Sequence, residues 1–235
     1  MKNVILRIRE ELKANGDEKA KESGQRFFKE AVKMYGVKTA LVTKIGKKYF
    51  SEIKNSSKAE IFNLCEQLWQ SGYMDETFIA CNWSYYIHKY YRKEDMEVFE
   101  RWIKKYVSNW AACDTLCNHS VGTLLEMYPE KTVTLKEWTR STNRWLKRAA
   151  AVSLIVPAKK GLFLPEILEI SDALLTDTDD LVQKGYGWML KAASQAQQKP
   201  IFDYVMKKKD KMPRTALRYA IEKMPRNLKI QAMEH

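Results

Sequence analysis

The sequence predicts an all-α protein, a superhelix (solenoid) of HEAT-like antiparallel helix pairs. No segment shows a sustained alternation of apolar and polar residues with a period of two, which argues against regular strands. Glycine (9) and proline (6) are scarce, whereas many-stranded β proteins are rich in tight turns. Trp102, Trp145 and Trp188 recur every 43 residues, each followed three positions later by a cation. This period lies within the roughly 40–47 residues of HEAT-type repeats.

The register of the repeat is open, and so is the number of domains. A competing alignment places Asn109-Trp110 on Arg144-Trp145, with an offset of 35 residues, although the match of Trp145 with Trp188 is the stronger one. A chain of 235 residues is long enough for one domain or two small ones. We expect a single HEAT-like domain over residues 1–235.

The helices of the N-terminal part follow from apolar stripes and from start and stop signals. Gly36 is placed to end one helix and Thr39 to start the next. Ser57, with Glu60 three residues later, has the pattern of a capping box, and Ser71-Gly72 ends that helix. The aromatic side chains of residues 77–92 are typical of a packed core rather than of a base-stacking platform. Helices are expected over 2–14, 19–34, from 39 past 49, 58–70, 77–92 and 96–107.

The C-terminal part has the same kinds of signal. Asn109 and Asn143 each open a helix, because an Asn side chain can accept a hydrogen bond from the first turn. An apolar segment after Arg148 is expected to end at Pro157, and residues 161–175 form another helix. Residues 176–180 form an acidic capping cluster, which the helix dipole favours. Residues 200–206 and 214–224 are predicted to be the last two helices, joined by the basic stretch 207–214, which is a solvated loop or a phosphate contact.

Charge and composition limit the partners and the compartment. Lys and Arg (41) exceed Asp and Glu (29) by 12, with a pI near 9.4, which favours a polyanion partner, either nucleic acid or an anionic membrane surface. No apolar run approaches the roughly 20 residues of a membrane span, and the charged N-terminus is unlike a secretory signal. We therefore expect no membrane partner. Four cysteines without a disulfide pattern indicate reduced thiols and a cytoplasmic protein.

The polar starts of two predicted helices carry the candidate functional residues. Trp110 and Asp114 are four residues apart, and Trp145 and Arg148 three apart, so each pair lies on one helix face. With Trp188, a carboxylate, aromatic planes and a cation suit a nucleotide whose sugar becomes cationic during bond cleavage. The alternative from spacing alone is a helix-capping Asp, a structural Arg and two core tryptophans.

Other kinds of chemistry have weaker signals. Cys113, Cys117 and His119 lie within seven residues, but zinc usually takes paired short spacings and four ligands. His88 and His235 are the other histidines, so a buried helix face explains the two cysteines more simply, and we expect no metal site. The chain lacks a nucleophile elbow and a glycine-rich phosphate loop, which argues against serine hydrolases, kinases, NTPases and dehydrogenases.

At these positions the chain resembles the AlkD-type DNA alkylation-repair glycosylases. The resemblance covers nearly the whole chain in order, and no single motif is decisive. The matching motifs are Tyr35-Gly36-Val37-x-Thr39, Trp110-x3-Asp114, Tyr128-Pro129-Glu130, Asn143-x-Trp145-Leu146-x-Arg148-Ala149-Ala150, Gln183-Lys184-x2-Gly187-Trp188-x-Leu190 and Leu217-Arg218-Tyr219-Ala220-Ile221.

The resemblance implies a helix-pair superhelix around duplex DNA and hydrolysis of the N-glycosidic bond of N3- and N7-alkylated purines. It assigns Asp114 as the catalytic carboxylate that stabilises the oxocarbenium ion and orients water, with Trp110 and Trp188 beside the sugar. Arg148 is expected to hold the nearby phosphate. An alkylated purine is already cationic and leaves as a neutral base, so neither a strong general acid nor a cofactor is needed.

We expect a monomer that binds duplex DNA containing alkylated bases. The DNA-binding residues expected from the resemblance and from the charge pattern are Arg148, Lys147, Asn143, Lys184, Lys191, Lys38 and Thr39.

Three residues depart from the family pattern. Asn109 replaces the first residue of a frequent Trp-Trp pair, and Asp180 with Leu181 replaces an aromatic pair. An acidic side chain at position 180 is unfavourable next to phosphate. The alternative functions are a non-catalytic HEAT-like module for damaged or branched DNA and a protein-interaction solenoid.

Overall fold

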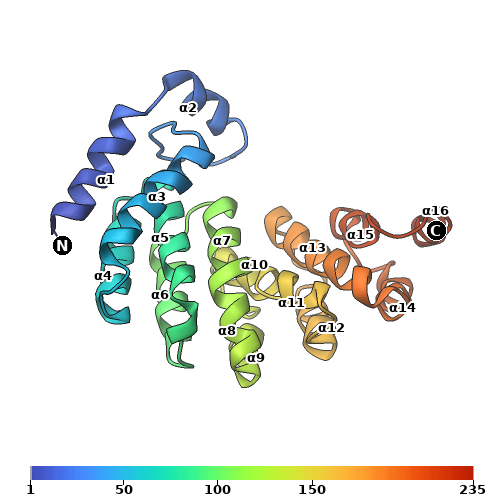
Figure 1. Cartoon of the computed structure of the whole chain (residues 1–235). Coiled ribbons are helices and arrows are strands. Elements are labelled where there is room, and N and C mark those ends of the chain that lie inside the picture. The colour runs from blue at the N-terminus through green and yellow to red at the C-terminus, as the bar shows by residue number, and fades with distance from the viewer. Residues whose placement is uncertain (1, 235) are drawn as a thin grey trace. The chain divides into compact units, whose positions relative to one another are not determined.

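The computed structural model describes residues 2–234, which form two compact units (Figure 1). One unit extends to Leu116 and the other begins at Cys117. The described part of the chain consists of helices and their connections, with one isolated bridge between Lys33 and Tyr73 and no longer strand. The predicted all-α class is confirmed, and a single domain over the whole chain stays a prediction. No helix within residues 2–234 is both long and apolar enough to cross a bilayer.

The first unit consists of helices packed in two layers. Helices α3, α5 and α7 pack in succession, while α4 packs against both α5 and α6. This is the helix-pair arrangement that the sequence predicts. The helices are α1 Lys2–Ala14, α2 Glu18–Gln25, α3 Thr39–Ile53, α4 Lys58–Gln70, α5 Met74–Tyr86, the 3-10 helix η1 His88–Tyr90, α6 Asp95–Tyr106 and α7 Trp110–Leu116.

Local signals and aromatic packing define these helices. The capping box at the start of α4 is present, because Ser57 accepts from the Glu60 amide and the Glu60 carboxylate accepts from the Ser57 amide. The aromatic residues of 77–92 are partly core, since Trp83 and Tyr91 are buried and Phe78, Tyr85 and Tyr86 are half-buried. Trp83 is fully buried and its Nε1 donates to the Gly46 carbonyl at 2.8 Å, whereas Tyr90 is 70% exposed.

The predicted helix over 19–34 is wrong in its second half, because α2 ends at Gln25. The Gln25 amide donates to the Glu30 carbonyl at 2.8 Å, and its oxygen accepts from the Val32 amide at 2.9 Å. This side chain therefore holds residues 26–32 in a non-helical path. The helix was predicted from the local apolar periodicity. That pattern does not reveal the contacts that the Gln25 side chain and α5 make with this segment.

A buried carboxylate fixes the rest of this connection. Asp75, on α5, is 3% exposed and accepts hydrogen bonds from the backbone amides of Tyr35 (2.9 Å) and Val37 (3.2 Å). Gly36 between them has a φ of +82°, and an added Cβ would lie 2.2 Å from the Asp17 carbonyl. Only glycine fits this conformation and this close approach. The chain thus reaches the start of α3 on a fixed path.

Asp75→Ala is expected to destabilise the first unit by about 1.5–3 kcal/mol, because two buried amides lose a charged acceptor. Urea unfolding followed by circular dichroism measures the change, with the exposed Asp203→Ala as the control. Equal stability of the two variants would contradict the role given to Asp75.

The same variant tests a pH dependence. Burial raises the pKa of Asp75 above its usual value, although the backbone amides of Tyr35 and Val37 oppose the shift. A folded pKa above the unfolded one gives a stabilising contribution that is complete below the unfolded pKa and is lost as pH rises through the folded pKa. Asp75→Ala should remove this part of the pH dependence, which unfolding measured across that interval would detect.

The second unit repeats the two-layer packing. Helices α10, α13 and α15 pack in succession, α9 packs against α12, and α13 also contacts α12 and α14. The elements are the π-helical turn η2 Cys117–Val121, α8 Gly122–Met127, the 3-10 helix η3 Pro129–Lys131, α9 Thr132–Trp138, α10 Arg144–Val152, α11 Ile155–Lys159, α12 Leu164–Ala173, α13 Asp180–Ala196, α14 Gln198–Lys208, α15 Arg214–Ile221 and α16 Arg226–Met233.

Two predicted helix ends in this unit are wrong. Pro157 lies inside α11 rather than after the preceding helix, because a proline within a first turn removes no helical hydrogen bond. The chain also continues past the two helices predicted to be last, into α16. There Lys209, from the end of α14, donates its ammonium to the carbonyls of Gln231 and Glu234 and so caps α16 across 22 and 25 residues.

The 43-residue repeat does not place its tryptophans at equivalent positions in their helices, because Trp145 is the second residue of α10 and Trp188 is the ninth residue of α13. Trp145 and Trp188 lie on α10 and α13, which are successive packed helices of one layer. Trp102 is fully buried on α6, which packs against α4, and does not share this position. Close packing also explains Gly187, since an added Cβ would lie 2.8 Å from the Ala216 carbonyl on α15.

Candidate functional site

The start of α7 places two candidate residues of the first unit on one helix face. Asn109 is 5% exposed, and its side-chain oxygen accepts from the Ala112 amide at 2.9 Å, which confirms the predicted cap. Trp110 occupies the first turn and is partly exposed. Asp114 follows one turn later and is 8% exposed. Burial lowers the local dielectric constant, so the Asp114 carboxylate acts more strongly on nearby positive charge than an exposed one would.

The non-helical segment 26–32 holds the ring of Trp110. The Phe28 ring stacks on it with centroids 5.3 Å apart, and the indole nitrogen donates to the Phe27 carbonyl at 3.3 Å. The Phe27 side chain itself is 72% exposed. Both phenylalanines lie within the helix predicted over 19–34, 83 and 82 residues before Trp110, so sequence spacing does not connect them with it. No local signal predicts this contact.

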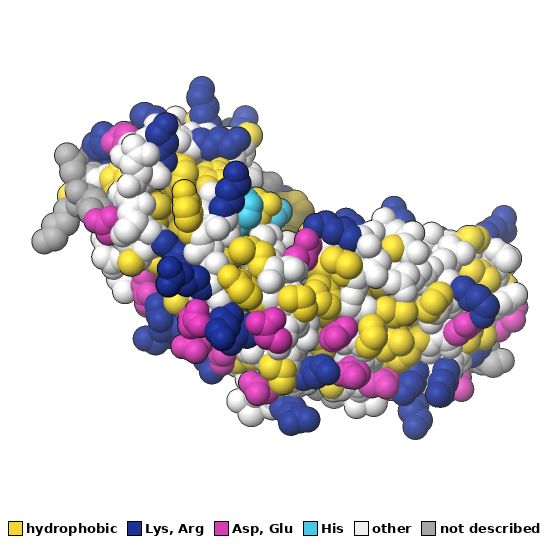
Figure 2. All heavy atoms as spheres, turned by 60° about the horizontal axis from the view of Figure 1, so that its bottom comes forward, with side chains coloured by type: hydrophobic (Ala, Val, Ile, Leu, Met, Phe, Trp, Pro, Cys, Tyr) yellow, Lys and Arg dark blue, Asp and Glu magenta, His cyan; other side chains and the backbone are white. Residues whose placement is uncertain are grey.

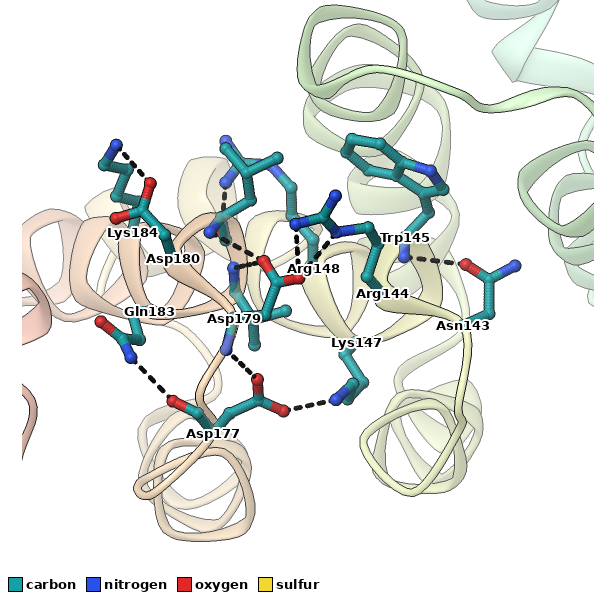
Figure 3. Close-up of polar contacts among 12 residues, drawn as sticks. Asn143, Arg144, Trp145, Lys147, Arg148, Asp177, Asp179, Asp180, Gln183 and Lys184 are labelled. Atoms are coloured by element: carbon teal, nitrogen blue, oxygen red, sulfur yellow. Dashed lines mark hydrogen bonds and ion pairs between the residues drawn. The ribbon is translucent and has the colours of Figure 1, made fainter. Parts of the chain in front are cut away.

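The start of α10 carries the corresponding residues of the second unit. Asn143 accepts from the Trp145 amide at 2.9 Å (Figure 3), and its own amide donates to the Ser141 hydroxyl at 3.1 Å. The predicted cap is confirmed, and Trp145 and Arg148 follow within one turn. Trp145 is 8% exposed and belongs mainly to the core.

Arg148 is buried between α10 and α13. It is 5% exposed, and its guanidinium donates to the Leu181 carbonyl in the first turn of α13. Gly185, one turn further along α13, leaves room for it, since an added Cβ would lie 3.4 Å from Arg148 Cγ. A buried guanidinium loses conformational freedom before any ligand binds, so Arg148 presents a fixed cation.

Three ion pairs join or flank the starts of α10 and α13 (Figure 3). Arg144 Nε donates to Asp179 at 2.7 Å, and Lys147 pairs with Asp177 at 2.5 Å. Lys184 pairs with Asp180 at 2.8 Å, one turn earlier on its own helix. Two of the predicted DNA-binding cations, Lys147 and Lys184, therefore have carboxylate partners within the unit.

The same acidic residues cap α13. Asp179 accepts from the amides of Leu181 (2.9 Å) and Val182 (3.3 Å), and Asp177 accepts from the Asp179 amide at 2.8 Å. The predicted capping cluster is confirmed. It has a further role that spacing did not predict, because Asp177 and Asp179 also bind cations of α10.

The remaining candidate residues lie on α13 and at the start of α3. Trp188 is partly exposed on α13. Lys191 pairs with Glu222 at 2.9 Å and lies 5.3 Å from the centre of the Tyr219 ring, and its hydrogen bond lowers the pKa of Glu222. In the first unit, Lys38 and Thr39 are exposed where α3 begins.

Each unit therefore places some of the candidate residues together. Trp110 and Asp114 share a face of α7 in the first unit, and Arg148 and Trp188 lie on the packed helices α10 and α13 of the second. The assignment of these four residues to one catalytic site stays a prediction.

The cysteines are not arranged as metal ligands. Cys113 and Cys117 are both buried, and residues 2–234 contain no group of three or more His, Cys, Asp or Glu side chains placed to hold a metal ion. His235, one of the histidines considered above, lies outside the described residues. Burial raises the pKa of the Cys65 thiol, as expected for a core cysteine.

A family model for DNA alkylation repair enzymes matches residues 8–224. The chain belongs to the DNA alkylation repair enzyme family. This membership confirms the resemblance and supports an enzyme of alkylation repair, with DNA as its substrate.

The fold agrees with this family. The solved structure of a "Predicted DNA alkylation repair enzyme from Enterococcus faecalis" is similar with a TM-score of 0.81, and the match covers 90% of this chain and 98% of that one. At 13% sequence identity, the likeness shows the fold alone. A comparison with curated proteins finds no match.

Arg148→Ala is expected to keep the helical circular dichroism spectrum but to lower stability by about 1.5–3 kcal/mol, because the Leu181 carbonyl loses a charged donor. Urea unfolding measures the loss, and Arg148→Lys, which keeps the charge and a donor, should lose less. A collapse of helicity in Arg148→Ala would show that the residue serves the fold alone.

Proposed function

We propose that this protein is a DNA glycosylase that hydrolyses the N-glycosidic bond of N3- and N7-alkylated purines in duplex DNA, in base excision repair of alkylation damage. The observation that carries the proposal is the buried Asp114 carboxylate, one turn after a partly exposed tryptophan in a member of an alkylation-repair family. The formal net charge of +12 fits a polyanionic substrate.

Cleavage of this glycosidic bond requires a group that stabilises positive charge on the sugar more than it requires an acid that protonates the base. Alkylation gives the purine a positive charge, so the base leaves as a neutral molecule when the bond to C1′ breaks and the sugar becomes an oxocarbenium ion. The Asp114 carboxylate and the faces of Trp110 and Trp188 stabilise that cation. Water, oriented by Asp114, adds to C1′ and gives up its proton, which leaves an abasic site. This route uses no metal and no cofactor.

In this proposal, residues of both units contact the DNA backbone. Arg148 holds the phosphate beside the lesion through its fixed guanidinium. Asn143, Lys147, Lys184 and Lys191 contact neighbouring phosphates, and the three lysines do so by exchanging carboxylate partners. The exposed Lys38 and Thr39 at the start of α3 are further contacts. The proposed enzyme acts as a monomer, and its four free, buried cysteines are typical of a reducing compartment such as the cytoplasm.

The alternative is a non-catalytic DNA-binding module for damaged or branched DNA. The two functions differ in whether Asp114 is required for the release of a base.

Asp114→Asn is expected to lower the rate of 7-methylguanine release from a methylated duplex by about 100-fold or more, because it removes the charge that stabilises the oxocarbenium ion. Chromatography of the released base under single-turnover conditions measures the rate. Asp203→Asn, which removes an exposed carboxylate of α14, is the matched control and should release base like the wild type.

The outcomes separate the two functions. Release by the wild type and loss in Asp114→Asn alone supports the glycosylase. Duplex binding by both proteins without release by either would reject the glycosylase in favour of the non-catalytic module.

A further inference from the structure

The acidic residues 177–180 neutralise a group of cations that face them from α10 and α13. Arg144, Lys147 and Lys184 each pair with one of three carboxylates, Asp179, Asp177 and Asp180 respectively. Three positive charges and three negative charges thus cancel within one small region (Figure 3). The wider surface also mixes charges, since basic and acidic side chains alternate along the lower part of the face in Figure 2.

The three pairs differ in how open they are to solvent. The Lys147 and Asp177 side chains are 21% and 11% exposed, while those of Lys184 and Asp180 are 35% and 38% exposed. An exposed pair of this kind, one turn apart on a helix, contributes little to stability. Asp179 also caps α13 and Asp177 accepts from the Asp179 amide, whereas Lys184 donates to Asp180 one turn away on the same helix. Lys184 is therefore the cation that changes its partner at the lowest cost.

We infer that Asp180 is a specificity-determining residue that limits affinity for intact duplex DNA by competing with the backbone phosphate for Lys184. This inference rests on the proposed function. A phosphate that binds Lys184 must break the ion pair and must also lie near the Asp180 carboxylate, whose charge has the same sign as its own. Binding of ordinary duplex through this cation is weakened, so more of the binding energy must come from contacts at the lesion.

The simpler role for Asp180 is stabilisation of α13. An acidic residue in the first turn of a helix interacts favourably with the helix dipole, and Asp180 occupies that position. If this were its whole role, replacing Asp180 would change stability and leave DNA affinity unchanged. DNA binding therefore distinguishes the two roles.

The test uses the full chain and an undamaged duplex of fixed length. Asp180→Asn keeps the size of the side chain and removes its charge, so Lys184 becomes available to a phosphate. One additional phosphate contact steepens the plot of log affinity against log salt by about 0.9. The variant should therefore bind roughly threefold to tenfold more tightly than the wild type at about 0.1 M salt, with that steeper slope.

Two further variants isolate the pair. Asp203→Asn removes the same charge from another Lys–Asp pair spaced four residues apart, that of Lys199 and Asp203 at 2.7 Å, and should give little gain. Lys184→Ala removes the cation for which Asp180 competes, so it should abolish the gain in the Asp180→Asn background. A double-mutant cycle on binding free energy measures this coupling.

Other results would overturn the inference. If the wild type binds duplex with a salt-dependent affinity and Asp180→Asn gains no more than Asp203→Asn, the role of Asp180 fails while the proposed function stands. A gain that persists after Lys184→Ala would show a general charge effect instead. If the wild type binds no duplex at low salt, both this inference and the proposed function fail.

Discussion

The candidate site depends on the capping of helix starts by side-chain oxygens. The first amides of a helix have no partner inside it, and Asn109, Asn143 and Asp179 supply acceptors for α7, α10 and α13. Each cap fixes where the helix begins, and hence which side chains share a face one turn later. Trp110 with Asp114, and Trp145 with Arg148, owe their placement to this interaction. The Leu181 carbonyl that holds Arg148 depends in turn on the cap at Asp179.

The charges near these helix starts then determine which charged groups the helix faces can bind. The chain carries a surplus of positive charge, yet lysines near the candidate site are paired with carboxylates from the same unit. Arg148 is more deeply buried than these lysines, and its guanidinium donates to a backbone carbonyl. Fixed charges of this kind are suited to one phosphate and one cationic sugar, whereas the paired lysines moderate the attraction for DNA in general. Such a distribution suits an enzyme that must leave undamaged duplex easily.

Sequence patterns predicted the features that local chemistry determines. The all-α class, the caps at Asn109 and Asn143 and the capping box at Ser57 all follow from signals within a few residues of one another. The features that the sequence missed depend on contacts between distant residues. Segment 26–32 leaves the helix through the bonds of Gln25, Phe28 reaches Trp110 from 82 residues away, and Lys209 caps α16. The partners of Lys147 and Lys184 were missed because the acidic cluster was assigned to helix capping alone.

The most direct test of the central claim compares a cationic lesion with a neutral one in otherwise identical duplexes. The proposed mechanism relies on stabilisation of a sugar cation and assigns no strong acid to the departing base. The account therefore predicts accelerated release of 7-methylguanine, which leaves without protonation, and no acceleration for hypoxanthine, which is neutral in DNA. Equal acceleration of both would contradict the account, because it would require an acid that protonates the leaving base.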